Sequence, residues 1–99
     1  MNKAEMVDRV AEMTGFSVKE TRKLVDAIFD PDPHVGLIAA ELVSGNKVAI
    51  SGFGTFEARA RKARVGRNPH TGDPLDIPAM RAPTFKAGKP LKETLRDAH

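Results

Sequence analysis

The chain has no cysteine among its 99 residues. A disulfide framework and a thiolate metal site are therefore both excluded, and a reducing compartment is compatible with the composition. No apolar run approaches the roughly 18 residues that a membrane-spanning helix needs, and residues 1–5 lack the charged-then-apolar pattern of a signal peptide. We expect a soluble cytoplasmic protein that has no membrane partner.

Signatures of catalysis are also lacking. The three histidines, His34, His70 and His99, are scattered without the spacing of metal ligands, and no nucleophile elbow or phosphate-cradling loop occurs. Asp30 and Asp32 form an acidic pair, but the prolines beside them favour a cap or a turn over metal or acid–base chemistry. We predict that the protein is not an enzyme and that it has no catalytic residue, metal, cofactor or small-molecule substrate.

Charge is distributed unevenly along the chain. Residues 1–51 hold six Lys and Arg against eight Asp and Glu, whereas residues 52–99 hold ten against five. The carboxy-terminal half is therefore the half that would face a polyanion. Because a basic half is often only a solvated surface, charge alone does not establish nucleic-acid binding.

Two helices are predicted at the amino end. Asn2 is a suitable N-cap for the first, with Glu5 three residues later, and Gly15 supplies a left-handed stop. Ser17 begins a stronger capping box, behind which an apolar stripe continues at helical spacing to Phe29. The two helices should form a hairpin.

Prolines interrupt the helical pattern after this point. Pro31 and Pro33 lack an amide hydrogen and restrict the residue before them, so the second helix should stop. We expect Asp32 to cap a further helical segment with Pro33 at its first position, and Gly45 to end it. This segment is either a third short helix or a displaced continuation of the second. Residues 1–46 are thus predicted to form a helical part.

The period of the sequence changes to two from Lys47, which predicts a strand. Gly52 and Gly54 flank an aromatic residue, which suggests a bulge or a close approach of the backbone. Phe53 would then be directed into the core, with the strand resuming at Thr55.

Residues 57–64 alternate small and basic side chains and have hardly any large apolar group. As a strand they offer no face that could pack on a core, so they should project into solvent. Residues 75–80 read as the returning strand, joined through a turn at residues 66–72. The predicted fold is α+β, with a sheet and ribbon arm over residues 47–85 and a short helix over residues 86–99, all within one domain.

An arm rich in arginine suits DNA, because each guanidinium can replace a condensed counterion and fit a narrow, negatively charged groove. Pro69 adds a rigid apolar wedge that can enter between base pairs and kink the duplex, although without arginine neighbours it would be only a turn residue. We predict that the chain bends double-stranded DNA through the minor groove. The candidate DNA-binding residues are Arg59, Arg61, Lys62, Arg64, Arg67, Asn68, Pro69 and Thr71 on the arm, with Lys3, Arg81, Lys86 and Lys89 elsewhere.

Residues 52–56, 66–72 and 83–92 resemble the bacterial histone-like DNA-bending family that includes HU and integration host factor, and they are most similar to HU. The resemblance implies an intertwined homodimer with a helical base, a three-stranded antiparallel sheet and two arms that embrace the duplex, Pro69 intercalating. It also implies an architectural protein of the bacterial nucleoid that bends and compacts DNA with low sequence specificity. The chain departs from the family by about six extra residues near positions 30–36, where the second helix usually continues.

The same sequence features are compatible with other partners and other degrees of specificity. A site-specific factor resembling integration host factor would rely on sequence-dependent deformability, and the family also contains heterodimers. An arm that adds strands to a protein partner, or a basic half that recognises RNA by shape, would place the chain in another class.

Phe53, Phe56 and Phe85 are assigned to packing rather than to base stacking. The lysines within residues 86–92 fit a solvated helix side as well as phosphate contacts, and His70 fits a pH sensor or no role.

Overall fold

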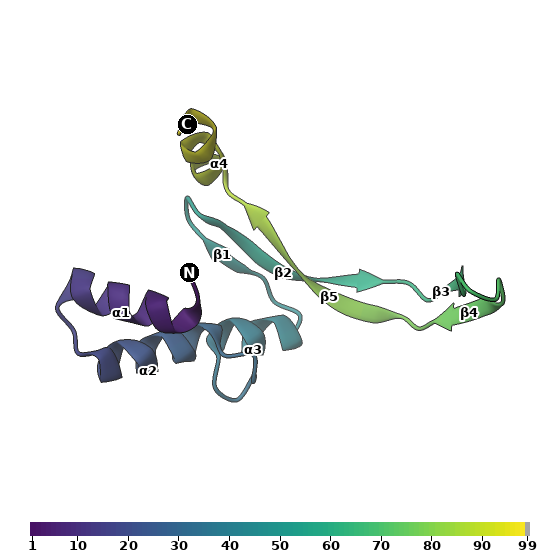
Figure 1. Cartoon of the computed structure of the whole chain (residues 1–99), viewed down its shortest axis with the longest axis horizontal. Helices are drawn as coiled ribbons and strands as arrows, with labels where there is room; N and C mark the ends of the chain where they lie inside the picture. Colours follow the sequence, from purple (N-terminus) through teal and green to yellow (C-terminus); the bar gives the residue numbers. More distant parts are fainter. Residues whose placement is uncertain (99) are drawn as a thin grey trace. The chain divides into compact units, whose positions relative to one another are not determined.

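The computed structural model describes residues 1–98. Contacts within the chain divide it into two compact units, one spanning Met1–Ser44 and the other beginning at Gly45. The first unit contains helices α1 to α3, and the second contains strands β1 to β5 and helix α4 (Figure 1). In the part of the chain that the structure describes, no helix is both long enough and apolar enough to cross a bilayer.

Helices α1 (Lys3–Thr14) and α2 (Val18–Phe29) form the predicted hairpin, and their ends follow the predicted caps. The Asn2 side chain accepts a hydrogen bond of 2.8 Å from the backbone N–H three residues later. Ser17 does the same at 3.1 Å. Gly15 ends α1 with a φ of 80°, a left-handed conformation that costs a glycine little. Local capping chemistry thus determines where both helices begin.

The two helices bury a narrow set of side chains against each other. Val7 and Ala11 of α1 are buried, as are Thr21 and Val25 of α2. The Thr21 hydroxyl is satisfied, because it donates a hydrogen bond of 2.9 Å to the carbonyl oxygen of Ser17. A buried hydroxyl with a partner does not carry the penalty of an unpaired polar group. This small cluster is the core of the first unit.

The third helix begins later than the sequence predicts. Helix α3 spans Leu37–Val43, so the expected start at Pro33 is wrong. Asp32 caps a turn instead: its side chain accepts a hydrogen bond of 2.9 Å from the His34 N–H. Its carbonyl oxygen accepts a further bond of 2.8 Å from the Gly36 N–H. These bonds close the chain on itself before a helix can form, and Gly36 then leaves the turn in an extended conformation.

The segment 30–36 is an excursion whose ends meet. A Cβ atom added to Gly36 would overlap the backbone carbonyl oxygen of Asp30, so the two residues lie in direct contact. Figure 1 shows the segment as a loop between α2 and α3, with α3 resuming beyond it. The interruption that the prolines predict is therefore confirmed, and it returns the chain to the place where it left α2.

Deleting residues 31–36 is expected to fuse α2 and α3 into one helix. Ile38 would then follow Ile28 by four residues, so the apolar stripe would stay in phase. Removing six residues that bury no large side chain lowers the entropy cost of folding. We expect a gain of about 1 kcal/mol and a rise in Tm of about 4 to 8 °C. Thermal unfolding followed by circular dichroism measures both stability and helix content.

A control for this deletion replaces the same six residues by a Gly-Ser repeat. This variant keeps the length of the excursion but removes its prolines and its capping residue, so it should be no more stable than the natural chain. A deletion variant with a lower Tm and no added helix signal would contradict the prediction, and would show that the segment stabilises the natural fold.

Three strands form an antiparallel sheet in the second unit. They are β1 (Val48–Ile50), β2 (Gly54–Arg61) and β5 (Met80–Ala87), in the order β1-β2-β5. Strand β2 pairs along its whole length with β5, from Gly54 opposite Ala87 to Arg61 opposite Met80. The predicted three-stranded antiparallel sheet is confirmed.

The glycines before β2 form a turn, so the predicted bulge and the predicted continuation of one strand are wrong. The Phe53 N–H donates to the carbonyl oxygen of Ile50 at 2.9 Å, and Gly52 has a φ of 78°, which allows the chain to reverse. The expected close approach is confirmed at Gly54, which lies against the Phe85 ring. Phe53 is about half exposed in the single chain, although its ring centroid lies 5.6 Å from that of Phe85.

Beyond the sheet the chain forms the predicted ribbon arm. Strands β3 (Arg64–Arg67) and β4 (Pro74–Ile77) pair at its end (Figure 1). Because β3 and β4 include residues 66 and 67 in their pairing, the tip is residues 68–73 rather than the predicted 66–72. Helix α4 (Lys89–Asp97) follows β5 and lies within the predicted residues 86–99. It begins three residues later than predicted, because residues 86 and 87 still belong to β5. The predicted fraying at His99 lies outside the described residues.

Candidate nucleic-acid interface

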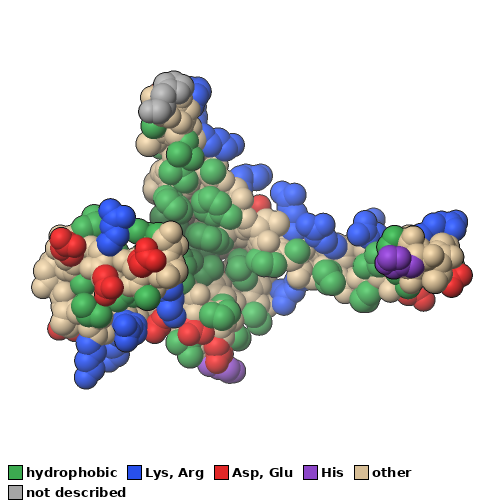
Figure 2. All heavy atoms as spheres, in the orientation of Figure 1, with side chains coloured by type: hydrophobic (Ala, Val, Ile, Leu, Met, Phe, Trp, Pro, Cys, Tyr) green, Lys and Arg blue, Asp and Glu red, His purple; other side chains and the backbone are tan. Residues whose placement is uncertain are grey.

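The basic residues predicted to bind DNA on the arm are all exposed. Arg59 and Arg61 lie on β2, Lys62 follows it, and Arg64 and Arg67 begin and end β3. Figure 2 shows Lys and Arg side chains distributed along the length of the arm. Guanidinium and ammonium groups carry a positive charge at neutral pH. The arm therefore presents a row of positive charge to solvent.

At the base of the arm, one carboxylate lies between two of the cations. Glu57 is half-buried, and its oxygens lie 3.9 Å from an Nη of Arg59 and 3.5 Å from the Nζ of Lys47. The side chains of both cations are largely exposed, and ion pairs screened by solvent contribute little stability, so a phosphate can compete for Arg59. Glu57 thus lies on β2 between the charges that are paired within the sheet and the arginines that follow on the arm.

The tip is held by its own polar side chains. Asn68 accepts hydrogen bonds from the backbone N–H groups of His70 at 2.8 Å and Thr71 at 3.4 Å. Such a side-chain turn fixes the backbone around the residue that it spans. Pro69 is consequently an exposed residue on a loop whose backbone is held by hydrogen bonds. Asn68 and Thr71, predicted to bind DNA, are observed here as residues that shape the loop around Pro69.

Arg67 closes the base of the tip. One Nη atom donates a hydrogen bond of 3.2 Å to the carbonyl oxygen of Gly72, whose φ of 75° completes the reversal of the chain. The Asn68 N–H donates a further bond of 2.8 Å to the Asp73 carbonyl oxygen, and the Gly72 N–H donates to the Asn68 carbonyl oxygen at the same distance. The tip is therefore cross-linked on both sides of Pro69.

The predicted basic residues outside the arm have varied surroundings. Lys3, in the first unit, donates a hydrogen bond of 2.7 Å to Asp26, and this bond, followed by the charge of Asp26, raises the pKa of Lys3. Lys89 begins α4 and lies 3.9 Å from Glu93. Arg81 and Lys86 lie on β5, and Lys86 is exposed. A phosphate that binds Lys3 must replace an existing carboxylate partner.

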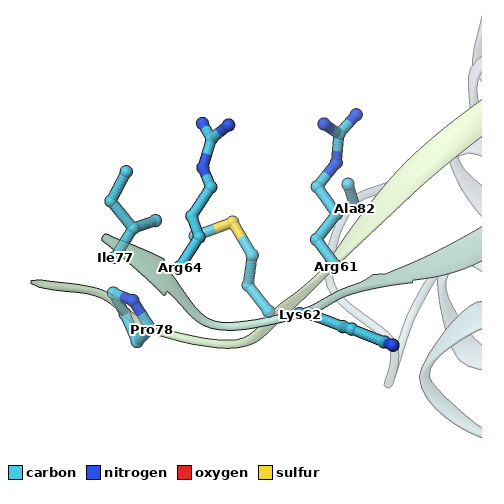
Figure 3. Close-up of a pocket in the computed structure, with 7 residues that line it drawn as sticks. Arg61, Lys62, Arg64, Ile77, Pro78 and Ala82 are labelled. Carbon is cyan, nitrogen blue, oxygen red and sulfur yellow. The ribbon is translucent and has the colours of Figure 1, made fainter. Parts of the chain in front are cut away.

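A groove on the arm was not predicted. It has a volume of about 600 Å³ and lies where the sheet strands give way to the ribbon (Figure 3). Its lining combines basic and apolar side chains, which are Arg61, Lys62, Arg64, Ile77, Pro78, Met80 and Ala82. The sequence signal for it is Pro78, since proline inside a strand marks an edge or a break in pairing.

These features define a class of protein: an α+β chain with a cationic ribbon arm suited to a polyanion. Residues 1–96 match the family model described as "Bacterial DNA-binding protein". The chain belongs to this family of bacterial DNA-binding proteins. It is 48% identical over 96 residues to DNA-binding protein HU of Geobacillus stearothermophilus, covering 97% of this chain and 100% of that protein. It is 50% identical to the SPbeta prophage-derived DNA-binding protein HU 2 of Bacillus subtilis, covering 97% and 98%.

Solved structures of HU proteins share the fold. An Anabaena HU–DNA cocrystal structure matches with a TM-score of 0.84 and 42% identity, covering 99% of this chain and 100% of that chain. HU from Thermotoga maritima matches with a TM-score of 0.63 and 33% identity, covering 96% and 98%. The predicted α+β class and the predicted membership of the histone-like family are confirmed.

Proposed function

We propose that this protein is an architectural factor that binds double-stranded DNA through the minor groove, bends it and compacts it, rather than a catalyst. The observation that carries the proposal is the exposed arm, whose cations have no core to pack on and whose tip presents Pro69. The names of the relatives favour an HU-like role with little sequence preference over that of integration host factor. The site of action would be the bacterial nucleoid in the cytoplasm.

We propose that the active form is a homodimer. Of the described residues, only Val7, Ala11 and Val25 are buried apolar side chains, which is a small core for a chain of this length. Large apolar side chains remain exposed in both units, including Phe16, Leu24, Ile28, Phe29, Leu37, Val43, Ile50, Phe53 and Phe85. Burying each would contribute about 1.5 to 3 kcal/mol, so a second copy that covers them is strongly favoured. Residues 1–99 would then form one DNA-bending domain with its partner.

Within this proposal the predicted residues divide into three roles. Arg59, Arg61, Lys62, Arg64 and Arg67 would neutralise phosphates or enter the groove along the arm. Pro69 would intercalate, held in position by the turn of Asn68 and Thr71. Once the duplex is bent, its flanks would meet further positive charge, from Arg81, Lys86, Lys89 and Lys3.

A titration of duplex binding against salt tests the proposal. Affinity should fall linearly with salt on logarithmic axes, because neutralised phosphates release condensed counterions. Duplex RNA of matched length is the control, since its minor groove is wide and shallow and should be bound more weakly. Affinity that does not change with salt, or that favours RNA, would exclude the proposed mode.

Replacing Pro69 with alanine is expected to lower the bend without abolishing binding. Alanine cannot unstack a base step as a rigid wedge does, so the bend should decrease by about 20° or more. Affinity should change by less than about tenfold, since the phosphate contacts remain. Energy transfer between dyes at the two ends of a duplex measures the bend. Pro74→Ala is the matched control, because Pro74 lies in β4 outside the tip, and an equal loss in both variants would refute the wedge.

A further inference from the structure

The arm contains a break that does not change its register. The pairing of β2 with β5 ends at Arg61 opposite Met80, and the pairing of β3 with β4 starts at Arg64 opposite Ile77. Two residues on each strand lie between these pairs without ladder pairing. Since the two sides skip the same number of residues, no residue is inserted, and the break is not a bulge.

Two prolines show that the break changes the hydrogen-bonding phase. In an antiparallel ladder, hydrogen-bonded pairs alternate with pairs that are not bonded. Pro83 lies opposite Ala58 and Pro74 lies opposite Arg67. Proline has no N–H, so both pairs must be of the kind that is not bonded. Pro74 and Pro83 are nine positions apart, which is an odd number, so one continuous ladder would place one of them in a bonded pair.

Two further observations agree with this reading. The Asn68 N–H donates to the carbonyl oxygen of Asp73, so Asn68 and Asp73 form a bonded pair next to the pair of Arg67 and Pro74. A bonded pair is expected there if the pair at Pro74 is not bonded. On the sheet side, the next bonded pair after Arg61 would join residue 63 to Pro78, and Pro78 cannot donate. Pro78 therefore ends the sheet ladder where the structure shows it ending, and the ribbon continues one residue out of phase.

The phase change determines which side chains share a face. Arg61 and Arg64 are three residues apart, so a continuous strand would place them on opposite faces. Because both belong to bonded pairs of their own ladders, the break returns them to the same face. Figure 3 shows the guanidinium groups of Arg61 and Arg64 extending to the same side of the ribbon, with Lys62 extending away from them. The groove between them is lined by Ile77 and Pro78.

We propose that this break is a positioning joint that sets Arg61 and Arg64 side by side, so that they contact neighbouring backbone phosphates of one DNA strand. Pro78 is its positioning residue: it touches no phosphate and acts by ending the sheet ladder. The inference rests on the proposed DNA binding and adds to it the spatial arrangement of two of the cations.

The test compares the contribution of Arg64 to DNA binding with and without the joint. Pro78→Val supplies the missing donor, so the sheet ladder should extend to residue 63 and turn Arg64 to the opposite face. In the natural background, Arg64→Ala should lower the slope of log affinity against log salt by about one for each arm. In the P78V background it should leave the slope nearly unchanged. Arg61→Ala should lower the slope in both backgrounds.

A structural readout accompanies the binding data. In P78V the new N–H of residue 78 can donate to the Ala63 carbonyl oxygen and complete a bonded pair in which the Ala63 N–H donates to the residue 78 carbonyl oxygen. Hydrogen exchange of the Ala63 amide should therefore slow, and Pro78→Ala should have the same effect with a smaller side chain. Lys62→Ala is the matched control for charge: it removes one cation from the opposite face of the arm.

The outcomes separate the two proposals. Slower exchange at Ala63 with an undiminished effect of Arg64→Ala would overturn the shared face, and unchanged exchange in both Pro78 variants would overturn the role of Pro78. Natural protein whose duplex binding is insensitive to salt would instead reject the proposed function itself. Loss of the Arg64 effect together with slower exchange would establish the joint.

Discussion

Replacing Arg61, Arg64 and Arg67 together with alanine is expected to weaken duplex binding by at least about 100-fold near physiological salt. All three residues are exposed and lie on the outer part of the arm. The slope of log affinity against log salt should fall by about 0.9 for each phosphate contact that is lost. Fluorescence anisotropy of a labelled duplex at several salt concentrations measures both quantities.

A matched triple variant removes the same charge from elsewhere. Arg9, Lys19 and Lys23 are exposed basic residues of the helical unit, and their replacement changes the net charge by an equal amount. Long-range attraction depends on the total charge, whereas counterion release depends on which cations reach phosphates. If both triple variants lost equal affinity and equal slope, the arm would have no special part in binding.

Replacing Gly54 with alanine is expected to destabilise the fold by about 2 kcal/mol or more. An alanine Cβ would lie 2.5 Å and 2.6 Å from two carbons of the Phe85 ring and 2.7 Å from the Lys86 carbonyl oxygen. Phe85 also packs against Phe56, with ring centroids 4.9 Å apart. The Lys86 carbonyl oxygen belongs to the backbone, so a change of side-chain rotamer alone cannot relieve the overlap. Tm should fall by about 10 °C in thermal unfolding.

The control for this variant is Gly66→Ala. Its Cβ would lie 3.0 Å from the Cδ1 atom of Ile77, which is the far end of a flexible side chain on the arm. The strain there can be relieved by a change of rotamer, so Tm should change by only a few degrees at most. A Gly54→Ala variant no less stable than Gly66→Ala would contradict the tight packing at the start of β2.

Features encoded by neighbouring residues were predicted well. The caps of Asn2 and Ser17 each depend on residues within one turn of helix, so the sequence determines where those helices begin. The arm was predicted for a similar reason, because small and basic residues in alternation exclude a buried face. The proposal that the arm binds DNA rests on arginine chemistry and on the family resemblance.

Features that depend on distant partners were predicted poorly. The glycines around Phe53 suggested a bulge, and only the pairing of β1 with β2 shows that they form a reversal. The spacing of Pro74, Pro78 and Pro83 determines the change in hydrogen-bonding phase along the arm. This change can be inferred only when the residues paired with these prolines are known. The start of α3 was missed because the Asp32 turn competes with a helix cap of the same composition.

The excursion at residues 30–36 also offers a place to attach a probe. Its ends meet, so a changed or longer segment need not alter the direction of the helices on either side. His34 is exposed on this segment, and the chain has no cysteine. A cysteine placed at position 34 would be the single thiol of each subunit, available to one dye or spin label without removing any native residue of the arm.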